Sequence, residues 1–501
     1  MSWDAGWLRG LLGAAAFTAA VAVALLLIFP AGFPNYDTVY FLLWGTELAD
    51  GVRPDYGAPL APTPHPLAMA AAALISPLGG GMATATMIVA YSSLGLLAYF
   101  VFRLGSLWFD RWIGATAALI VLTRAPFLSN GLRAYVDVPY IVLCLAALLI
   151  ESRRPRAGWP VLGLLAVAGL LRPEAWLFSA VYVAYLLVGV ERVEGRWRPR
   201  WRPGVTPRGV VAALTLALAA PLIWAGFDLL TTSDPLYSFF GTRETVETLE
   251  RQTGPLDMVL YGPRRLGEVL QWPGMIGAAA GLALGLTLMP SSSARGAAAV
   301  AFALAAFVLL GSAGLAIIPR YTMLAAALLA IFCALALLGW RLLPVADPWR
   351  GRWRLAAVAV LALFVLWLPN QYELDSRVGS DLADQGSVED DLNQLATAPT
   401  AFEPGCGPIS VPNHRAVPRL ALALGVPPSS MVSNEEEHPI AGGYYLAPAS
   451  EFVIRNFILD PNDPARVVSE VPAGFRLAAA NQSWRLYGRC DRKGDAVEAV
   501  D

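Results

Sequence analysis

The sequence predicts a polytopic α-helical membrane protein with about eleven transmembrane helices, followed by a small domain of mixed α/β structure. Two observations support this fold class. The 501 residues are 56% hydrophobic and only 15% charged, whereas about 25% of the residues in an ordinary soluble domain are charged. The apolar residues also gather into long runs as far as residue 369, beyond which charged stretches alternate with short strand-like segments. We therefore expect lipid to be the main solvent of residues 1–369.

Apolar runs that are long enough to cross a bilayer define the expected spans. The hydrocarbon core is about 30 Å thick, so a helix crosses it with about 20 mostly apolar residues. By this criterion we expect spans at residues 11–31, 84–103, 111–127, 138–151, 158–171, 174–190, 209–231, 273–290, 296–316, 321–340 and 354–369. The stretch 66–78 is also apolar, but it begins and ends at prolines and is too short to cross. We expect it to lie at the membrane interface.

The arginines decide the orientation, because short cytoplasmic loops collect Lys and Arg. If the N-terminus lies inside, the inner loops carry most of the arginines. One inner loop then carries six: Arg192, Arg196, Arg198, Arg200, Arg202 and Arg208. Counting 66–78 as a span would move this loop outside. The first span could instead be a cleaved signal peptide, but its length and the aromatic segment that follows favour an uncleaved anchor.

This orientation divides the chain into two expected domains. Residues 1–369 form the transmembrane domain, with outer loops at 33–83 and 232–272, and residues 370–501 form an extracytoplasmic domain. In the second outer loop a Gly-Pro pair separates two amphipathic stretches, which predicts two helices lying over the outer face. In the extracytoplasmic domain we expect strand-like runs at PISVPN, EFVIRNFI and SWRLYGRC, and a helix at NHRAVPRLALALG.

The four cysteines fall into two environments. Cys144 and Cys333 lie inside apolar runs and are expected to be small buried side chains. Cys406 and Cys490 bracket the extracytoplasmic domain, where the environment is oxidising. Two cysteines in one such segment are expected to pair, so we predict a Cys406–Cys490 disulfide.

The composition also indicates the source membrane. Nearly all the basic residues are arginine, and Ala, Gly and Pro are abundant, as is typical of a GC-rich bacterial genome. We therefore expect the cytoplasmic membrane of a bacterium, with the N-terminus in the cytoplasm. The partners expected from this setting are the lipid bilayer and molecules at its outer face, and no nucleic acid.

Asp37 is the first candidate for chemistry. Ionisable groups at the edge of a membrane are costly, so they tend to be functional or paired. Asp37 follows the first span directly and opens a short amphipathic stretch that includes Tyr40 and Trp44. It could cap that helix, because an aspartate at the N-cap accepts hydrogen bonds from free amide groups. It could equally be a catalytic carboxylate that points into a cavity.

Other ionisable residues occur at four places on the same outer side. They are His65 in PTPHP, Arg133 and Asp137 in LRAYVDVPY, Arg172 and Glu174 in LLRPEAW, and Arg320 beside Tyr321 in IIPRY. The pairs Arg133–Asp137 and Arg172–Glu174 could each be a local structural ion pair. Carboxylates and arginines that converge below a loop would also suit transfer from an anionic lipid carrier.

This arrangement resembles the GT-C glycosyltransferases, in particular their protein O-mannosyltransferase and aminoarabinose-transferase branch. The resemblance covers roughly residues 10–190, and the rest of the chain supports only the general architecture. Four places carry it. Asp37 matches the acidic residue that opens the family's first outer loop, and His65-Pro66-Leu67 resembles its His-Pro-Pro-Leu segment. Asp137 matches an outer aspartate before a span, and Arg172-Pro173-Glu174 resembles an Arg-Pro-Glu turn. Two features depart from the family. Asp37 is followed by Thr38 and not by a second acidic residue, and no arginine enters the second span.

The resemblance implies an inverting glycosyl transfer at the outer face. The donor would be a polyprenyl-phosphate-linked sugar, and the acceptor a hydroxyl of a glycan, lipid or protein. Asp37 would act as the general base, and Arg320 and Arg172 would stabilise the departing phosphate. Asp137 and Glu174 would position the acceptor or the arginines. The expected substrate-binding residues are His65, Arg133, Asp137, Arg172, Glu174, Arg320 and Tyr321.

Other readings of the sequence remain. A divalent metal is possible, although His65, His414 and His438 are too scattered for zinc-ligand spacing. A multi-spanning transporter or lipid flippase would share the many helices and glycine breaks. A catalytically silent scaffold of the cell envelope would keep the same architecture but would not need Asp37. The absence of an internal repeat and the gathering of charges at one face favour the enzyme.

Overall fold

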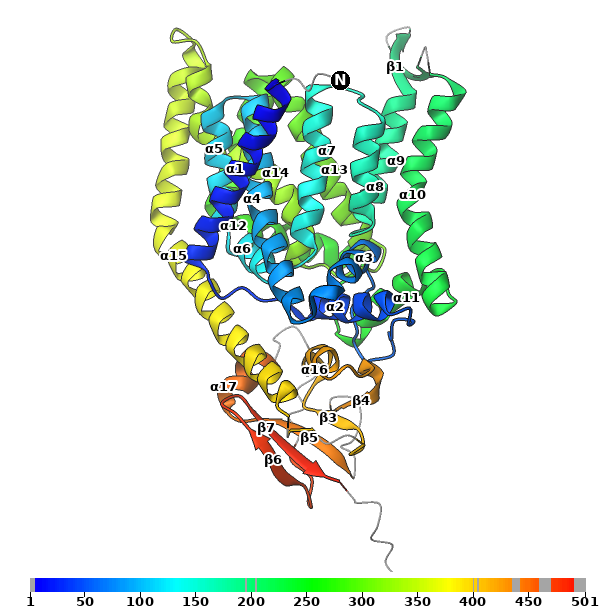
Figure 1. The fold of residues 1–501 in the computed structure, drawn as a ribbon. Coiled ribbons are helices and arrows are strands. Elements are labelled where there is room, and N and C mark those ends of the chain that lie inside the picture. The colour runs from blue at the N-terminus through cyan, green and yellow to red at the C-terminus, as the bar shows by residue number, and fades with distance from the viewer. Residues whose placement is uncertain are drawn as a thin grey trace, which may run out of the picture.

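A computed structural model of the chain describes residues 5–193, 196–202, 205–399, 401–402, 405–434, 442–458 and 470–490. Long helices run side by side in the membrane half, and a small sheet lies beyond one end of the bundle (Figure 1). The first described residues lie at the opposite end. His438 lies outside the described residues.

The bundle contains helices from both halves of the membrane part. The first half gives α1 (Ala5–Ile28), α4 (Met82–Trp108), α5 (Arg111–Leu122), α6 (Ala125–Leu132), α7 (Asp137–Arg153), α8 (Trp159–Gly169) and α9 (Glu174–Leu187). The second half gives α10 (Pro207–Thr232), α12 (Pro255–Leu288), α13 (Pro290–Ser312), α14 (Met323–Leu338) and α15 (Pro348–Thr397). At the end away from the sheet, β1 (Val188–Val193) and β2 (Arg196–Trp201) form an antiparallel hairpin within the expected six-arginine loop.

The number of spans is less definite than the sequence suggested. Among the described residues, seven helical segments are long and apolar enough to cross a membrane, and an eighth arises if α5 and α6, bent by 66°, count as one span. The other three expected spans correspond to α7, α8 and α9. The expected count of eleven is not confirmed, because α8 and α9 have only 11 and 14 residues. A helix of 11 residues is only about 16 Å long.

The helix α14 occupies the centre of the bundle. Its sequence, MLAAALLAIFCALALL, is apolar on every side, and a helix of this kind must be buried on every side. All its residues from Met323 to Ala336 are buried, including Cys333. The apolar stretches of α1, α10 and α15 instead bury few of their residues, as expected of surfaces that face lipid.

Short helices lie across the end of the bundle that faces the sheet: α2 (Tyr36–Ala49), α3 (Pro66–Ile75) and α11 (Tyr237–Thr248) (Figure 1). As expected, α3 packs beside α2 and does not run through the bundle. Gly79, with φ of 51°, interrupts the short 3-10 helix η1 (Ser76–Gly81) between α3 and α4. The Gly-Pro pair of the second outer loop separates α11 from α12, as predicted, with Gly254 at φ of 95°.

The helix α15 leaves the bundle without a break. It runs for 50 residues, about 75 Å, and passes through the boundary expected between residues 369 and 370. A stripe of buried residues in its outer part, which includes Val378, Leu382, Leu392 and Leu395, explains why the helix continues. A single helix therefore connects the membrane half to the outer part of the chain.

The outer domain contains a five-stranded mixed sheet. Its order is β4 (Met431–Ser433), β3 (Ile409–Val411), β5 (Gly443–Pro448), β7 (Trp484–Arg489) and β6 (Arg476–Ala480), and the first three strands are parallel. The helix α16 (Val417–Leu424) lies between β3 and β4 in the chain, within the predicted helical stretch. A disulfide joins Cys406 to Cys490, with the two Cα atoms 5.1 Å apart.

One strand expectation is wrong. The run EFVIRNFI is helical, forming α17 (Glu451–Val453) and a π-helical turn η6 (Ile454–Ile458). Val453 and Phe457 are both buried, and their spacing of four residues places them on one side of a helix.

The outer domain and the first outer loop share one hydrophobic core. Tyr40 and Trp44 of α2 are fully buried and pack in the same cluster as Leu420 of α16, Val388 of α15 and Trp484 of β7. The helix α2 therefore packs against the outer domain as well as against the membrane bundle.

Candidate active site

Asp37 lies in the first turn of α2, and its neighbour Asn35 is the residue that caps the helix. The Asn35 side chain accepts a hydrogen bond from the backbone nitrogen of Thr38 over 3.2 Å. Because Asn35 performs the capping, the Asp37 carboxylate is available for other contacts.

The Asp37 carboxylate faces Arg320, which comes from the far half of the chain. One carboxylate oxygen lies 3.3 Å from Nη1 of Arg320, in the short 3-10 helix η2 (Pro319–Thr322) before α14. The two side chains are 27% and 25% exposed. The Arg320 guanidinium also lies 5.4 Å from the centre of the Tyr135 ring. Asp37 and Arg320 thus form an accessible pair of opposite charges.

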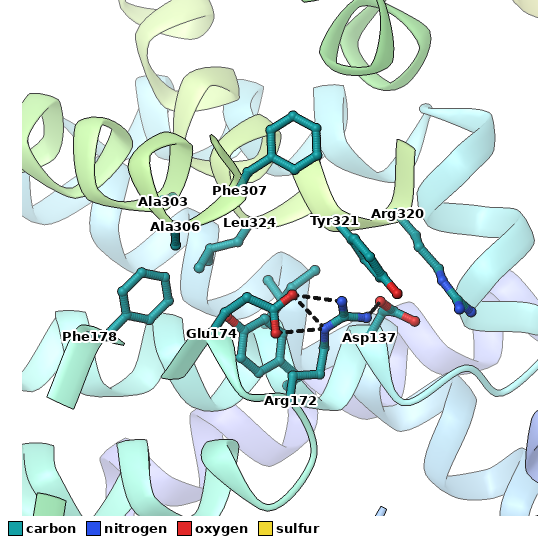
Figure 2. Close-up of a pocket in the computed structure, with 12 residues that line it drawn as sticks. Asp137, Arg172, Glu174, Phe178, Ala303, Ala306, Phe307, Arg320, Tyr321 and Leu324 are labelled. Atoms are coloured by element: carbon teal, nitrogen blue, oxygen red, sulfur yellow. Dashed lines mark hydrogen bonds and ion pairs between the residues drawn. The ribbon is translucent and has the colours of Figure 1, made fainter. Parts of the chain in front are cut away.

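A second, buried charge cluster lies beside this pair (Figure 2). Arg172, in the turn between α8 and α9, binds Asp137 at the start of α7 and Glu174 at the start of α9. The Arg172–Glu174 contact is 2.7 Å, and all three side chains are less than 10% exposed. Two carboxylates surround one guanidinium, which is how a buried arginine is stabilised.

Tyr321 connects the two groups of charges. Its ring centre lies 4.1 Å from the Arg172 guanidinium and 5.6 Å from that of Arg320. Arginine stacks favourably on the face of an aromatic ring. Asp37, Arg320, Tyr321, Arg172 and Glu174 therefore form a continuous row.

The pocket beside this row has two different walls. Asp137, Arg172, Glu174 and Arg320 form the charged wall, and Figure 2 shows Phe178 of α9 and the apolar side chains of α13 and α14 on the other side. The apolar lining includes Ala303, Ala306, Phe307 and Leu324. The space between the two walls is only about 10 Å³, so a ligand larger than water enters only when these side chains move apart.

His65 lies at the edge of the site and remains neutral. Its ring is 5.2 Å from the ring of Phe41 and 5.5 Å from that of Trp224, at the start of α3. Burial, together with the charges of Arg172 and Arg320, lowers the pKa of His65 to about 3. His65 therefore packs as a neutral ring between Phe41 and Trp224 and does not line the pocket.

Arg133 is placed differently from the other sequence-predicted residues. Its guanidinium donates two hydrogen bonds, of 3.1 and 2.9 Å, to the side-chain oxygen of Gln385 in α15, and another to Ser129. The ion pair with Asp137 considered from the sequence is not formed, because Asp137 binds Arg172.

Several residues that the sequence did not single out contribute to the site. Tyr135 lies beside Arg320, and Gln385 reaches Arg133 from α15. Asp228 of α10 is 2% exposed and accepts hydrogen bonds from the backbone nitrogen and hydroxyl of Ser238, which hold the start of α11. A carboxylate inside an apolar run was a signal that could have identified Asp228. Gln385 offered no such signal, because an uncharged residue in a polar stretch is unremarkable in sequence.

Within the part of the chain that the structure describes, no three His, Cys, Asp or Glu side chains gather in a way that could hold a metal ion. Arg172 already binds the two most buried carboxylates of the site.

Solved structures with a similar fold come from membrane glycosyltransferases. The crystal structure of the aminoarabinose transferase ArnT from Cupriavidus metallidurans bound to undecaprenyl phosphate matches 97% of this chain and 98% of its own, with a TM-score of 0.54 and 13% identity. The apo form of ArnT matches 95% of this chain and 98% of its own, with a TM-score of 0.54 and 14% identity. The apo oligosaccharyltransferase of Archaeoglobus fulgidus matches 86% of this chain and 65% of its own, with a TM-score of 0.47 and 10% identity.

Sequence comparison adds nothing to this likeness. No protein-family model matches the chain. No curated protein sequence matches it. Its apolar helices and its likeness to ArnT along nearly the whole length of both chains nevertheless agree. The chain is a multi-pass membrane protein with a GT-C-like fold.

Proposed function

We propose that the chain is an inverting glycosyltransferase that moves a sugar from a polyprenyl-phosphate donor to an acceptor hydroxyl, at the outer face of a bacterial cytoplasmic membrane. The observation that carries the proposal is the accessible pair of Asp37 and Arg320, 3.3 Å apart at one end of the bundle. A carboxylate can remove the proton of an attacking hydroxyl, and an arginine can stabilise a departing phosphate. Glycosyl transfer needs both groups close to the same anomeric carbon, and Asp37 and Arg320 are close enough to each other to meet this requirement.

The bonds change in a single displacement. The acceptor oxygen attacks the anomeric carbon while Asp37 takes its proton, and the bond from that carbon to the phosphate oxygen breaks. The phosphate leaves with the electron pair, and its added negative charge is stabilised by Arg320. Attack opposite the leaving group inverts the anomeric centre.

The two arginines suggested by the sequence take different roles in this proposal. Arg320 makes one contact of 3.3 Å with Asp37 and is a quarter exposed, so it can turn toward a phosphate. Arg172 is buried and held by two carboxylates. Its role is to hold Tyr321 in place beside Arg320.

The lipid part of the donor is supported by the chemistry of the side chains beside Arg320. Arg320 would bind the phosphate, and the apolar side chains of α9, α13 and α14 would pack against the first units of the polyprenyl chain. The similar fold of ArnT with bound undecaprenyl phosphate supports a donor of this chemical class. The arginine-rich strands β1 and β2 at the opposite end of the bundle support an outer position of the site.

The test is sugar transfer by the purified full chain in proteoliposomes, with radiolabelled polyprenyl-phosphate sugars and endogenous acceptor extracts. Asp37→Asn should lower transfer by about 10²–10⁴-fold, as expected when a general base is removed. The matched control is Glu373→Gln, which changes an exposed carboxylate of α15 that pairs with Arg377. Equal transfer by the wild type and Asp37→Asn would overturn the assignment of Asp37 as the base. Absence of transfer from the wild type with every donor would overturn the proposed function.

A further inference from the structure

The start of α2, which carries Asp37, is held by the turn between α6 and α7. The backbone nitrogen and side-chain nitrogen of Asn35 both donate to the carbonyl oxygen of Arg133, over 3.0 and 2.6 Å. The Thr38 hydroxyl donates to the carbonyl oxygen of Ala134 over 2.8 Å. Residues on both sides of Asp37 are therefore fixed to two successive carbonyl groups of this turn.

This α6–α7 turn is itself fixed to α15. The side chain of Arg133 donates from Nε and Nη2 to one oxygen of Gln385, over 3.1 and 2.9 Å. Two hydrogen bonds that converge from a planar guanidinium on one oxygen define its direction as well as its distance. The same residue, Arg133, thus uses its side chain to bind α15 and its carbonyl group to bind Asn35.

Other contacts connect the chain before α2 to the same stretch of α15. The Arg419 guanidinium donates to the carbonyl oxygen of Pro34 over 3.3 Å and to Glu389 of α15 over 2.6 Å. At Gly386 the ring of Phe33 lies so close that an added Cβ would be 3.6 Å from it. One turn of α15, from Gln385 to Glu389, therefore meets the segment that leads into the helix of Asp37.

We propose that Gln385 and Arg133 are positioning residues for Asp37, so that the outward extension of α15 determines where the catalytic base stands. This inference rests on the proposed function. Neither residue touches the reacting atoms, and each acts through the α6–α7 turn. A carboxylate displaced by about 1 Å from its productive position can lose up to about 100-fold in rate. The loss should appear in kcat, because the donor's binding surface on α9, α13 and Arg320 is unchanged.

The test compares Gln385→Ala with Gln385→Glu in the full chain. The alanine removes the acceptor of both hydrogen bonds, and we expect kcat to fall about tenfold or more while KM for the donor stays within about twofold. The glutamate keeps an acceptor for Arg133 and should restore most of kcat. Gln394→Ala, which removes an exposed glutamine further along the same helix, should change neither constant.

A second measurement separates positioning from simple loss of folding. Hydrogen exchange of the peptide that covers residues 33–40 should become faster in Gln385→Ala and in Arg133→Lys, which loses the planar fork. It should remain slow in Gln385→Glu and Gln394→Ala. Wild-type kcat in Gln385→Ala, or unchanged exchange of residues 33–40, would overturn the proposal. If the wild type transfers no sugar, the proposed function fails, and the exchange comparison alone decides whether α15 holds this segment.

Discussion

Removal of Arg172 should destabilise the chain far more than removal of Arg320, although both arginines line the same pocket. In Arg172→Met, Asp137 and Glu174 lose their shared cation while they are 1% and 9% exposed. Breaking a buried ion pair by removing one partner costs about 3–5 kcal/mol, because the remaining charge is buried without compensation. Arg320 and Asp37 are a quarter exposed, and a contact of this kind contributes about 0–1 kcal/mol.

Equilibrium unfolding of the purified chain in mixed micelles with increasing SDS, followed by tryptophan fluorescence, measures this difference. A loss of about 3–5 kcal/mol changes the unfolding equilibrium constant by about two to nearly four powers of ten. Arg320→Met should unfold close to the wild type and yet lose transfer. Adding Asp137→Asn and Glu174→Gln to Arg172→Met should recover part of the stability, because it removes the uncompensated charges. An Arg172→Met chain as stable as the wild type would refute the structural role given to this cluster.

Three further changes test other parts of the structure. Ala134 has a φ of 56°, which strains any residue with a Cβ, so Ala134→Gly should stabilise the chain by about 1 kcal/mol in the same unfolding assay. Replacing Cys406 and Cys490 by serine opens a loop with a sequence separation of 84, and it should destabilise the outer domain by up to about 4–5 kcal/mol, measured as faster proteolysis of that domain. The pKa of His65 is lowered from 6.5 to about 3, so the folded state binds fewer protons than the unfolded state, and stability present above pH 6.5 is lost as the pH falls toward 3. His65→Gln should lessen this acid-dependent loss in unfolding titrations between about pH 7 and about pH 4, whereas an unchanged pH dependence would contradict the burial of His65.

The fold class and the outer cluster could be predicted because both depend on local patterns. Apolar runs indicate helices in lipid, and a costly charge at the end of a run indicates a site or a pair. The local pair of Arg172 and Glu174 could also be recognised, but the distant partners of these charges could not. Arg172 binds Asp137, which is 35 residues away, and Asp37 meets Arg320, which is 283 residues away. Such contacts depend on how the helices pack, and a single sequence does not record that.

The outward extension of α15 was missed for a different reason. The expected span 354–369 ends at Pro369, yet the helix continues through this proline. The buried residues Val378 and Leu382 are four apart, and Glu373 pairs with Arg377 at the same spacing. Both spacings are typical of a helix. As sequence signals, however, they are weaker than the loss of hydrophobicity after residue 369, which indicates the end of a span.

The core shared by α2 and the outer domain can form only late in the synthesis of the protein. Tyr40 and Trp44 leave the ribosome early, whereas Leu420 and Trp484, which pack in the same cluster, belong to the last part of the chain. At about 5–20 residues per second, synthesis of the intervening chain takes roughly 20–90 s. During that interval the aromatic side of α2 must rest in the headgroup layer, where Tyr and Trp are well accommodated. The segment that carries Asp37 can then take its final position only after nearly the whole protein has been translated.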